Sequence, residues 1–274
     1  MEEKMKVKEV IDCLLDNTCG KQRLTHTCDI QTTGDSDMEV TGIVITFMAT
    51  VEVIRRTIEA GANFIITHEP TWFNGKDDTD WCENDSVYLA KKKLLEEHHI
   101  AVWRFHDHMH FGSSTDYIYT GMQEELGWKE YLQPDEIQPW VYEIPKTTLQ
   151  QLTLELKARF QMDVIQIIGR PDTRITRVGM LVGGGSLGLG REVMPMEVME
   201  RDRLNVLICG DITEWTTCAY VNDAQQLGFD RAMIVLGHER SEEAGMKHLV
   251  PVLQPIVGNT PVMFISAQEP FTYL

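Results

Sequence analysis

The sequence predicts an α/β protein made of two similar lobes. Short runs of β-branched and aliphatic residues alternate with segments of helical periodicity, which is the pattern of α/β folds. Three of these runs recur, in the same order, in the second half of the chain. With 274 residues, 43% of them hydrophobic and 24% charged, the chain has enough apolar material for a packed core. We therefore expect a duplicated α/β unit.

The expected elements follow this alternation along the chain. Helices are expected over residues 49–60 and 86–98, and a third helix begins at the capping box TLQQ (148–151). The turn GRPD (169–172) indicates a hairpin between the strands on either side of it. The expected strands cover residues 40–47, 63–67, 100–105, 164–168, 175–182, 205–209, 232–236 and 262–266.

The duplication rests on three sequence matches between the two halves. They pair NFIITHEPT (63–71) with NVLICGDIT (205–213), IAVWRFH (100–106) with AMIVLGH (232–238), and VTGIVI (40–45) with RVGMLV (177–182). Any one match could arise by chance, but their common order favours duplication.

The lobe boundary is expected in the proline-containing segment 127–145. We expect a first α/β lobe over residues 1–128 and a second over 129–274. The C-terminal segment 231–274 is expected to close a metal-binding cleft between the two lobes.

Charge and cysteine usage exclude several classes of protein. The net charge is −17 and the longest basic run is the triplet 91–93, so binding to a nucleic-acid polymer is not expected. No apolar run reaches the roughly 20 residues of a membrane span, and the charged N-terminus lacks the apolar core of a signal peptide. The six cysteines form no C-x-x-C pair, which favours free thiols in a cytoplasmic protein.

Histidines and carboxylates follow three of the expected strands. In open α/β sheets, ligands bind beyond the carboxyl ends of the strands. A spacing of four residues places two side chains on one side of a helix or tight loop. Imidazole and carboxylate together suit Zn, Fe, Mn, Co or Ni better than Ca or Mg, and six such ligands would hold two adjacent cations. The candidate ligands are His68, Glu69, His106, His110, His238 and Glu242.

Other interpretations of these residues remain open. A single histidine after a strand is more often a hydrogen-bonded structural residue than a metal ligand, and His108 is a possible substitute ligand. The run GGGSLG (183–188) fits the dinucleotide pattern G-x-G-x-x-G directly after a strand. Gly190 and Pro195 interrupt the helix that this motif requires, which favours a tight glycine loop beside the cleft over a nucleotide cradle.

Three motifs in order resemble the Nif-three-like family, whose members are hexameric proteins with a dinuclear metal centre, often labelled type-2 GTP cyclohydrolase I homologues. The family motif I-I-T-H-H-P-x-x-F appears as IITHEPTWF (65–73), A-H-T-N-x-D as FHDHMH (105–110), and G-H-x-x-[ST]-E as GHERSE (237–242). The stretch GDITE (210–214) resembles a further family loop, G-E-[IV]-S-E.

The resemblance implies that the six candidate ligands surround two divalent metal ions in a two-lobed α/β fold. It also implies a homo-hexamer built as a trimer of dimers. Glu69 stands where the family has histidine and His110 where it has aspartate, so a carboxylate moves from one place in the site to another. Asp107 stands where the family usually has threonine.

Three hypotheses about function follow. The first is a metal-dependent hydrolase acting on a phosphate ester, a nucleotide or a purine ring, with Glu214 or Asp211 as base or substrate contact. The second is a non-catalytic metal carrier or metal-responsive regulatory protein. The third is a nucleotide-binding module that uses the loop 183–188.

Overall fold

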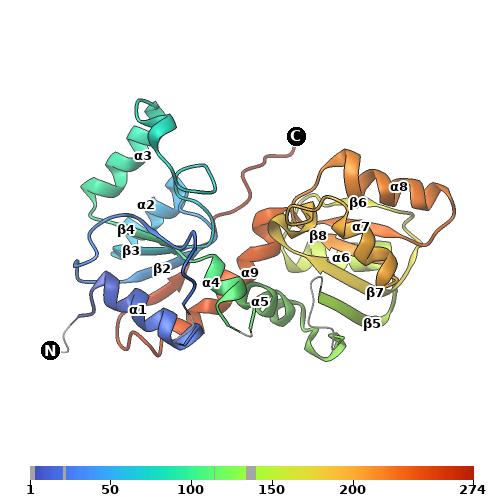
Figure 1. Cartoon of the computed structure of the whole chain (residues 1–274), viewed down its shortest axis with the longest axis horizontal. Helices are drawn as coiled ribbons and strands as arrows, with labels where there is room; N and C mark the ends of the chain where they lie inside the picture. Colours follow the sequence, from blue (N-terminus) through green and yellow to red (C-terminus); the bar gives the residue numbers. More distant parts are fainter. Residues whose placement is uncertain (1–3, 21–22, 114, 134–139) are drawn as a thin grey trace. The chain divides into compact units, whose positions relative to one another are not determined.

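A computed structural model describes residues 4–20, 23–113, 115–133 and 140–274 (Figure 1). The chain forms two compact units, and each unit contains one five-stranded sheet. Unit 1 consists of Met1–Gly121 and Glu243–Ala267, and unit 2 consists of Met122–Glu242 and Gln268–Leu274. The predicted α/β class is therefore confirmed.

The sheet of unit 1 has the strand order β1-β4-β3-β2-β10, in which β1 alone is antiparallel to its neighbour. The expected strands at 40–47, 63–67 and 100–105 and the expected helices at 49–60 and 86–98 are confirmed with slightly shorter bounds. In chain order the elements are α1 (Val7–Thr18), β1 (Gln31–Thr33), β2 (Ile43–Thr46), α2 (Val51–Glu59), β3 (Phe64–Thr67), the 3-10 helix η1 (Asp80–Cys82), α3 (Ser86–Glu97), β4 (Ala101–Arg104), α4 (Asp107–Phe111) and β10 (Val262–Phe264).

The central strands of unit 1 are buried along their whole length. Every residue of β2, β3 and β4 is buried, as is typical of parallel strands covered on both faces. Helices α2 and α3 cover one face, where Val53, Ile54 and Leu95 enter the core, and α1 lies on the other face (Figure 1). The polar residues of these strands, Thr46, Thr67 and Arg104, are therefore found only at the strand ends.

Helices α5 (Tyr117–Leu126) and α9 (His238–Leu253) each begin in one unit and end in the other. Within unit 1 they meet at two glycines. A Cβ added to Gly121 would lie 2.5 Å from the Cα of Gly245, and a Cβ added to Gly245 would lie 2.5 Å from the Cα of Ile118. This backbone contact requires glycine at both positions.

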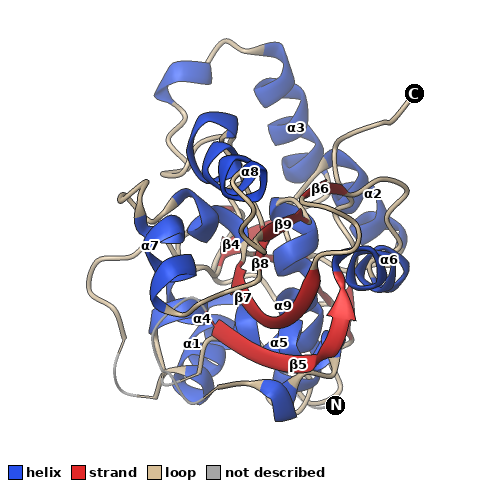
Figure 2. Cartoon of the chain, turned by 90° about the vertical axis from the view of Figure 1, so that its right-hand side faces the viewer, coloured by secondary structure: helices blue, strands red, loops and turns tan. Residues whose placement is uncertain are grey.

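The sheet of unit 2 has the order β5-β7-β8-β9-β6, in which β7, β8 and β9 are parallel and the two edge strands are antiparallel to their neighbours. Figure 2 shows α7 and α8 on one side of these strands and α6 on the other. The elements are η2 (Lys129–Tyr131), β5 (Trp140–Thr148), α6 (Leu149–Arg159), β6 (Gln166–Ile168), β7 (Arg174–Leu181), the 3-10 helix η3 (Gly183–Leu187), α7 (Met194–Arg201), β8 (Val206–Cys209), the π-helical turn η4 (Glu214–Cys218), α8 (Ala219–Gln226) and β9 (Ala232–Val235).

Two local predictions in unit 2 have clear outcomes. The capping box that starts α6 is confirmed, because Thr148 accepts from the backbone of Gln151 while the Gln151 side chain accepts from the Thr148 backbone. The hairpin between residues 164–168 and 175–182 is wrong: β6 pairs with β9, and β7 pairs with β5 and β8. The turn sequence predicts that the chain reverses, but it does not determine which strand becomes the hydrogen-bonded neighbour. The partly exposed β6 lies at the edge of the sheet.

The segment 127–145, expected to cross between lobes, contains the start of β5. Residues 134–139 lie outside the described part of the chain. Pro145 lies within β5 where the register with β7 shifts, between Glu143 and Thr147. A proline is tolerated there because an edge strand with a bulge does not need every backbone N–H.

The two sheets confirm the duplication. Strands β2, β3 and β4 match β7, β8 and β9 in order and direction, and both sets carry an antiparallel strand beyond the last member. Asn63 and Asn205 play the same part in each sheet, since their side-chain oxygens accept from the backbone N–H of Thr41 (2.8 Å) and of Arg177 (3.0 Å) respectively.

The observed division of the chain differs from the expected lobes 1–128 and 129–274. Residues 243–267 belong to unit 1, where β10 pairs in parallel with β2. A single boundary in the sequence cannot describe these units, because the chain returns to the first sheet after forming the second.

Candidate metal centre

Three histidines of unit 1 lie at neighbouring ends of parallel strands. Thr67, the last residue of β3, pairs with Arg104, the last residue of β4. His68 follows Thr67 directly, and His106 lies two residues beyond Arg104 at the N-cap of α4. His110 lies one helical turn further on, inside α4. The strand register therefore brings the three imidazoles together.

The three rings form one compact group. The ring centroids of His68 and His106 are 4.4 Å apart, and those of His106 and His110 are 5.2 Å apart. The Nε2 atoms of His68 and His110 are 3.2 Å apart. Two ligand atoms at right or tetrahedral angles on one ion, with bonds of about 2.1 Å, would be separated by about 3.0–3.4 Å. The group has the spacing of a metal-binding set.

The outer nitrogen of each ring contacts an oxygen. His68 Nδ1 lies 3.2 Å from the carbonyl oxygen of Phe105, and His106 Nδ1 lies 2.8 Å from Asp107 Oδ1. His110 Nδ1 lies 2.9 Å from Asp116 Oδ2. A carbonyl or carboxylate oxygen can only accept, so each Nδ1 is the donor, and in a neutral ring Nε2 is then the nitrogen that can bind a metal. This is the tautomer that a metal ligand requires.

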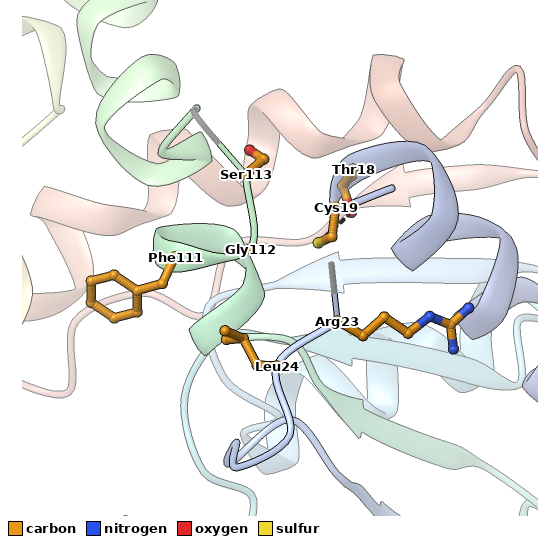
Figure 3. A pocket seen from close by; sticks show the side chains of 7 residues that line it. All are labelled: Thr18, Cys19, Arg23, Leu24, Phe111, Gly112 and Ser113. Carbon is orange, nitrogen blue, oxygen red and sulfur yellow. Dashed lines mark hydrogen bonds between the residues drawn. The ribbon is translucent and has the colours of Figure 1, made fainter. Parts of the chain in front are cut away.

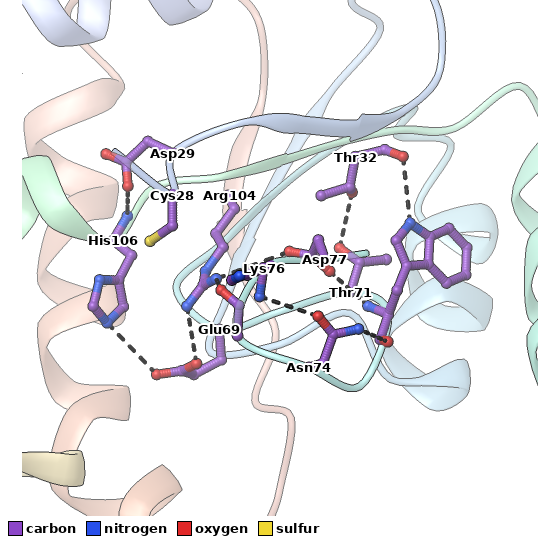
Figure 4. Close-up of polar contacts among 12 residues, drawn as sticks. Cys28, Asp29, Thr32, Glu69, Thr71, Asn74, Lys76, Asp77, Arg104 and His106 are labelled. Carbon is purple, nitrogen blue, oxygen red and sulfur yellow. Dashed lines mark hydrogen bonds and ion pairs between the residues drawn. The ribbon is translucent and has the colours of Figure 1, made fainter. Parts of the chain in front are cut away.

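Glu69 and its partner Arg104 adjoin this group (Figure 4). Glu69 Oε1 is 3.8 Å from His106 Nε2, and Glu69 Oε2 is 3.3 Å from an Arg104 amino group. Arg104 Nε also donates to the carbonyl oxygen of His68 at 3.1 Å. The Arg104 side chain is only 5% exposed, so this guanidinium fixes both His68 and Glu69 from the protein interior.

Asp29 holds the short helix α4 in place. Its carboxylate accepts from the backbone N–H groups of His106 (2.8 Å), Asp107 (2.7 Å) and His108 (3.0 Å). It also accepts from His108 Nδ1 at 2.6 Å, while His108 Nε2 accepts from the Leu24 N–H at 3.0 Å. Asp29 therefore caps α4 from a distant part of the chain. With both ring nitrogens engaged, His108 is a structural residue and not a substitute ligand.

Cys28 extends the network behind His106. Its backbone N–H donates to Asp107 Oδ2 at 2.9 Å, and its thiol lies 3.3 Å from Asp107 Oδ1. Burial alone would raise the pKa of Asp107, but these hydrogen bonds and His106 lower it to about 2. Burial raises the pKa of the Cys28 thiol to about 12. Asp107 is thus an anionic support for His106, which the family's usual threonine cannot be.

In unit 2, His238 and Glu242 form a second pair. His238 is the first residue of α9, and its Nε2 lies 3.0 Å from Glu242 Oε2, one turn along the helix. His238 Nδ1 lies 2.9 Å from Asp211 Oδ2. Asp211 therefore orients a candidate ligand, whereas Glu214 lies exposed at the start of η4 and is not part of these contacts.

The glycine loop packs directly against this pair. Gly183 has a φ of +48°, and a Cβ added there would lie 1.8 Å from Glu242 Oε1 and 2.8 Å from His238 Nε2. The loop forms the 3-10 helix η3, and α7 starts only at Met194. The glycine motif thus makes room for a histidine and a glutamate, and it does not run into the α-helix that a dinucleotide cradle requires.

A separate open hollow of about 700 Å³ lies in unit 1 (Figure 3). Among the lining residues that the structure describes, Arg23 is the one cationic side chain, and both Asp12 and Asp16 engage it at 2.8 Å. This described part of the lining therefore offers no free charge for an anionic ligand. Its lining residues are Thr18, Cys19, Arg23, Leu24, Phe111, Gly112 and Ser113.

The fold and these residues define a duplicated α/β protein with histidine–carboxylate sets at strand ends. The model of the Duf34/NIF3 (NGG1p interacting factor 3) family matches residues 5–270. The chain belongs to this family, which confirms the resemblance found in its motifs.

Solved structures share the fold at low sequence identity. A hypothetical protein of Staphylococcus aureus has a TM-score of 0.74 at 20% identity, covering 99% of this chain and 100% of that one. A Bacillus cereus protein related to NIF3 has a TM-score of 0.75 at 15% identity, with both chains fully covered.

Curated relatives match over a short segment. The GTP cyclohydrolase 1 type 2 homolog of Staphylococcus aureus strain Mu50 is 48% identical over 42 residues. The match covers 15% of this chain and 12% of that protein. Among the residues that the structure describes, no helix has the length and apolar character needed to span a membrane.

Proposed function

We propose that the chain binds two divalent metal ions and uses them as a hydrolase of small molecules. Four of the six proposed ligands lie in unit 1 and two in unit 2. The substrate would be a phosphate ester, a nucleotide or a purine-ring compound. The six ligands are His68, Glu69, His106, His110, His238 and Glu242.

One observation carries the proposal. The Nε2 atoms of His68 and His110 face each other at 3.2 Å, and in both rings the opposite nitrogen, Nδ1, faces an oxygen acceptor. Two such nitrogens at this separation need a positive charge between them, either a shared proton or a metal cation. The nitrogen and carboxylate donors suit Zn, Fe, Mn, Co or Ni, so the residues present fit a divalent transition metal.

The chain's own groups hold the ligands and the charge of the site. Arg104 fixes Glu69, while Asp107, Asp116 and Asp211 keep the outer proton on three of the imidazoles. When bound, divalent metal ions supply Lewis acidity and a water of lowered pKa. We propose Asp211 as a positioning residue for His238, and exposed Glu214 as the candidate base or substrate contact.

Metal content tests the proposal directly. Elemental analysis of the purified protein should give about two metal ions per chain, and the stoichiometry should fall in His68→Ala and in Glu242→Ala. If both variants lose the same metal, ligands from the two units serve one centre. Wild-type protein that binds no zinc, iron or manganese when these are supplied would contradict the proposal.

Turnover tests the hydrolase assignment separately. His238→Ala should abolish hydrolysis in a panel of phosphate esters and nucleotides, with an unchanged circular dichroism spectrum. A His238→Ala variant with wild-type turnover would exclude the mechanism even if the metal content agreed.

Partial exposure of two ligands favours a second candidate, a metal carrier or metal-responsive regulatory protein. The side chains of His106 and His238 are 25% and 30% exposed, so solvent reaches part of the ligand set. A carrier would exchange its metal within minutes in the presence of a chelator and show no turnover with any substrate.

We further propose a cytoplasmic homo-hexamer built as a trimer of dimers. The free state of all six thiols supports a reducing compartment. Light scattering coupled to size-exclusion chromatography would give about six times the 31.4 kDa chain mass, and a monomeric mass would contradict this assembly.

A further inference from the structure

Phe73 has an unusual backbone conformation for an aromatic residue. Its φ is +67°, in the left-handed region, and its side chain is 54% exposed. In this region the Cβ of an L-residue approaches a carbonyl oxygen, and bulky residues are found there only as outliers. A ring that is half in solvent gains too little from packing to explain the strain. Such strain persists where the surrounding structure enforces it, most often at functional sites.

The loop that carries Phe73 is held firmly on both sides. Trp72 donates its backbone N–H to Asp77 Oδ1 at 2.7 Å. The Asn74 side-chain amide donates to the carbonyl oxygens of Trp72 at 3.1 Å and Asp78 at 2.7 Å. These contacts span the residues before and after Phe73, so the loop fixes the left-handed conformation and the direction of the ring.

A buried lysine supports the ring from within the protein. The Lys91 ammonium lies 4.9 Å from the centroid of the Phe73 ring and donates to the Thr71 carbonyl oxygen at 2.7 Å. Lys91 itself is only 6% exposed. The cation–π contact therefore engages the inner part of the ring, and the remaining ring surface is available to a ligand.

The same loop is braced to a proposed metal ligand. Arg104 donates one amino group to the Gly75 carbonyl oxygen at 2.7 Å and places the other 3.3 Å from Glu69 Oε2 (Figure 4). One guanidinium thus links the loop around Phe73 to the carboxylate of the candidate centre. The loop borders that centre, and Phe73 is only four residues from Glu69 in the chain.

We propose that Phe73 is a stacking platform for a planar heteroaromatic ring of the substrate, whose reacting bond lies at the metal ions. This inference rests on the proposed function and narrows its substrate class to compounds with such a ring. The residues Asn74, Lys76 and Asp78 that follow in the loop are polar, so Phe73 presents a single exposed ring there. A planar ring fits this surface, whereas a stable protein interface needs about 800 Å² on each partner.

Binding measurements with matched probes test the proposal. Metal-loaded wild-type protein should bind GTP more tightly than inorganic triphosphate, which has the charge without the ring. Phe73→Ala should weaken GTP binding by roughly five- to a hundredfold and leave triphosphate binding unchanged, while Phe73→Trp retains GTP affinity. The matched control is Trp81→Ala, since Trp81 is 61% exposed in the same segment and lacks a positive φ.

Several outcomes would overturn the proposal. They are equal wild-type affinity for GTP and triphosphate, undiminished GTP binding by Phe73→Ala, or a change of oligomeric mass in that variant. Metal content separates this test from the test of the proposed function. Phe73→Ala should keep the full metal stoichiometry. A negative result in the stacking test would therefore not contradict the proposed metal centre.

Thermal unfolding tests the strain independently. Both Phe73→Ala and Phe73→Gly remove the ring, but only glycine tolerates a positive φ without strain. The glycine variant should unfold at a temperature about 2–4 °C higher than the alanine variant, with the same loss of GTP binding. If alanine is the more stable of the two, the conformation is not strained and the argument fails.

Discussion

Asp29→Ala should destabilise unit 1 far more than the replacement of an aspartate in a connecting segment usually does. The carboxylate accepts four hydrogen bonds, three from the first backbone N–H groups of α4 and one from His108 Nδ1. Its side chain is 1% exposed, so water cannot replace it in the folded protein. The substitution removes the cap of a helix that has only five residues to stabilise it.

The size of the effect follows from these contacts. Leaving a buried donor unsatisfied costs about 1–3 kcal/mol per group, and Asp29→Ala leaves four such donors. Because the contributions are not additive, we expect a loss of about 3–5 kcal/mol in the free energy of unfolding, measured by urea denaturation of metal-free protein. Since α4 carries His106 and His110, metal affinity should also fall about 10–100-fold in a chelator competition assay.

Asp37→Ala is the matched control. Asp37 also makes ion pairs, with Lys6 at 3.3 Å and Lys8 at 2.5 Å, but its side chain is 59% exposed. Solvent screens surface pairs of this kind, so they contribute little to stability. If Asp29→Ala and Asp37→Ala cost the same, Asp29 does not organise α4 and the reasoning is refuted.

Three further predictions concern other positions. Gly183→Ala should reduce bound metal because the added Cβ displaces Glu242, whereas Gly184→Ala, with no atom within 4 Å of its Cβ, should leave metal content unchanged. Burial lowers the pKa of Lys91 to about 8, so above that pH the unfolded chain binds more protons and stability rises until about pH 10.4, by at most about 3 kcal/mol. Urea denaturation at pH 7 and pH 10 should show this gain in wild type but not in Lys91→Met, and a gain of equal size in both would contradict it. The double variant E69H/H110D, which restores the common family ligands, should bind metal more weakly than wild type in the chelator assay; equal or tighter binding would show that the exchange has no supporting partners.

The sequence could predict the strand ends because their signal is local. An apolar run such as 63–67 that ends on a histidine places that histidine at the sheet edge, and both sheets confirm the expected strands. The supporting residues could not be predicted in this way. Asp29 and Asp116 lie in irregular segments without periodicity, and only the folded chain shows that each carboxylate meets a histidine nitrogen or a helix start.

The structure also changes how the two halves align. Sequence likeness sets Ile100 against Ala232, but the sheet register pairs Ala101 with Phe64 and Ala232 with Val206. If Asn63 is equivalent to Asn205, then Ala101 is equivalent to Ala232, and the second match shifts by one residue. His106 and His238 are therefore not equivalent: His106 occupies the N-cap position just before α4, and His238 is the first residue of α9.

The exchange of residue types at the candidate ligand positions 69 and 110 has a structural counterpart at each position. A carboxylate at Glu69 pairs with the buried Arg104 at 3.3 Å, whereas a histidine there would leave Arg104 with the more distant carboxylate of Asp77, at 4.0 Å. An imidazole at His110 is oriented by Asp116, 2.9 Å from its Nδ1, whereas an aspartate there would face a second carboxylate. Each exchanged residue thus has a complementary neighbour: the carboxylate has a cation, and the imidazole has a carboxylate. These two candidate ligands in unit 1 therefore differ from the family pattern together with matching partners, and the negative charge moves from position 110 to position 69 without being lost.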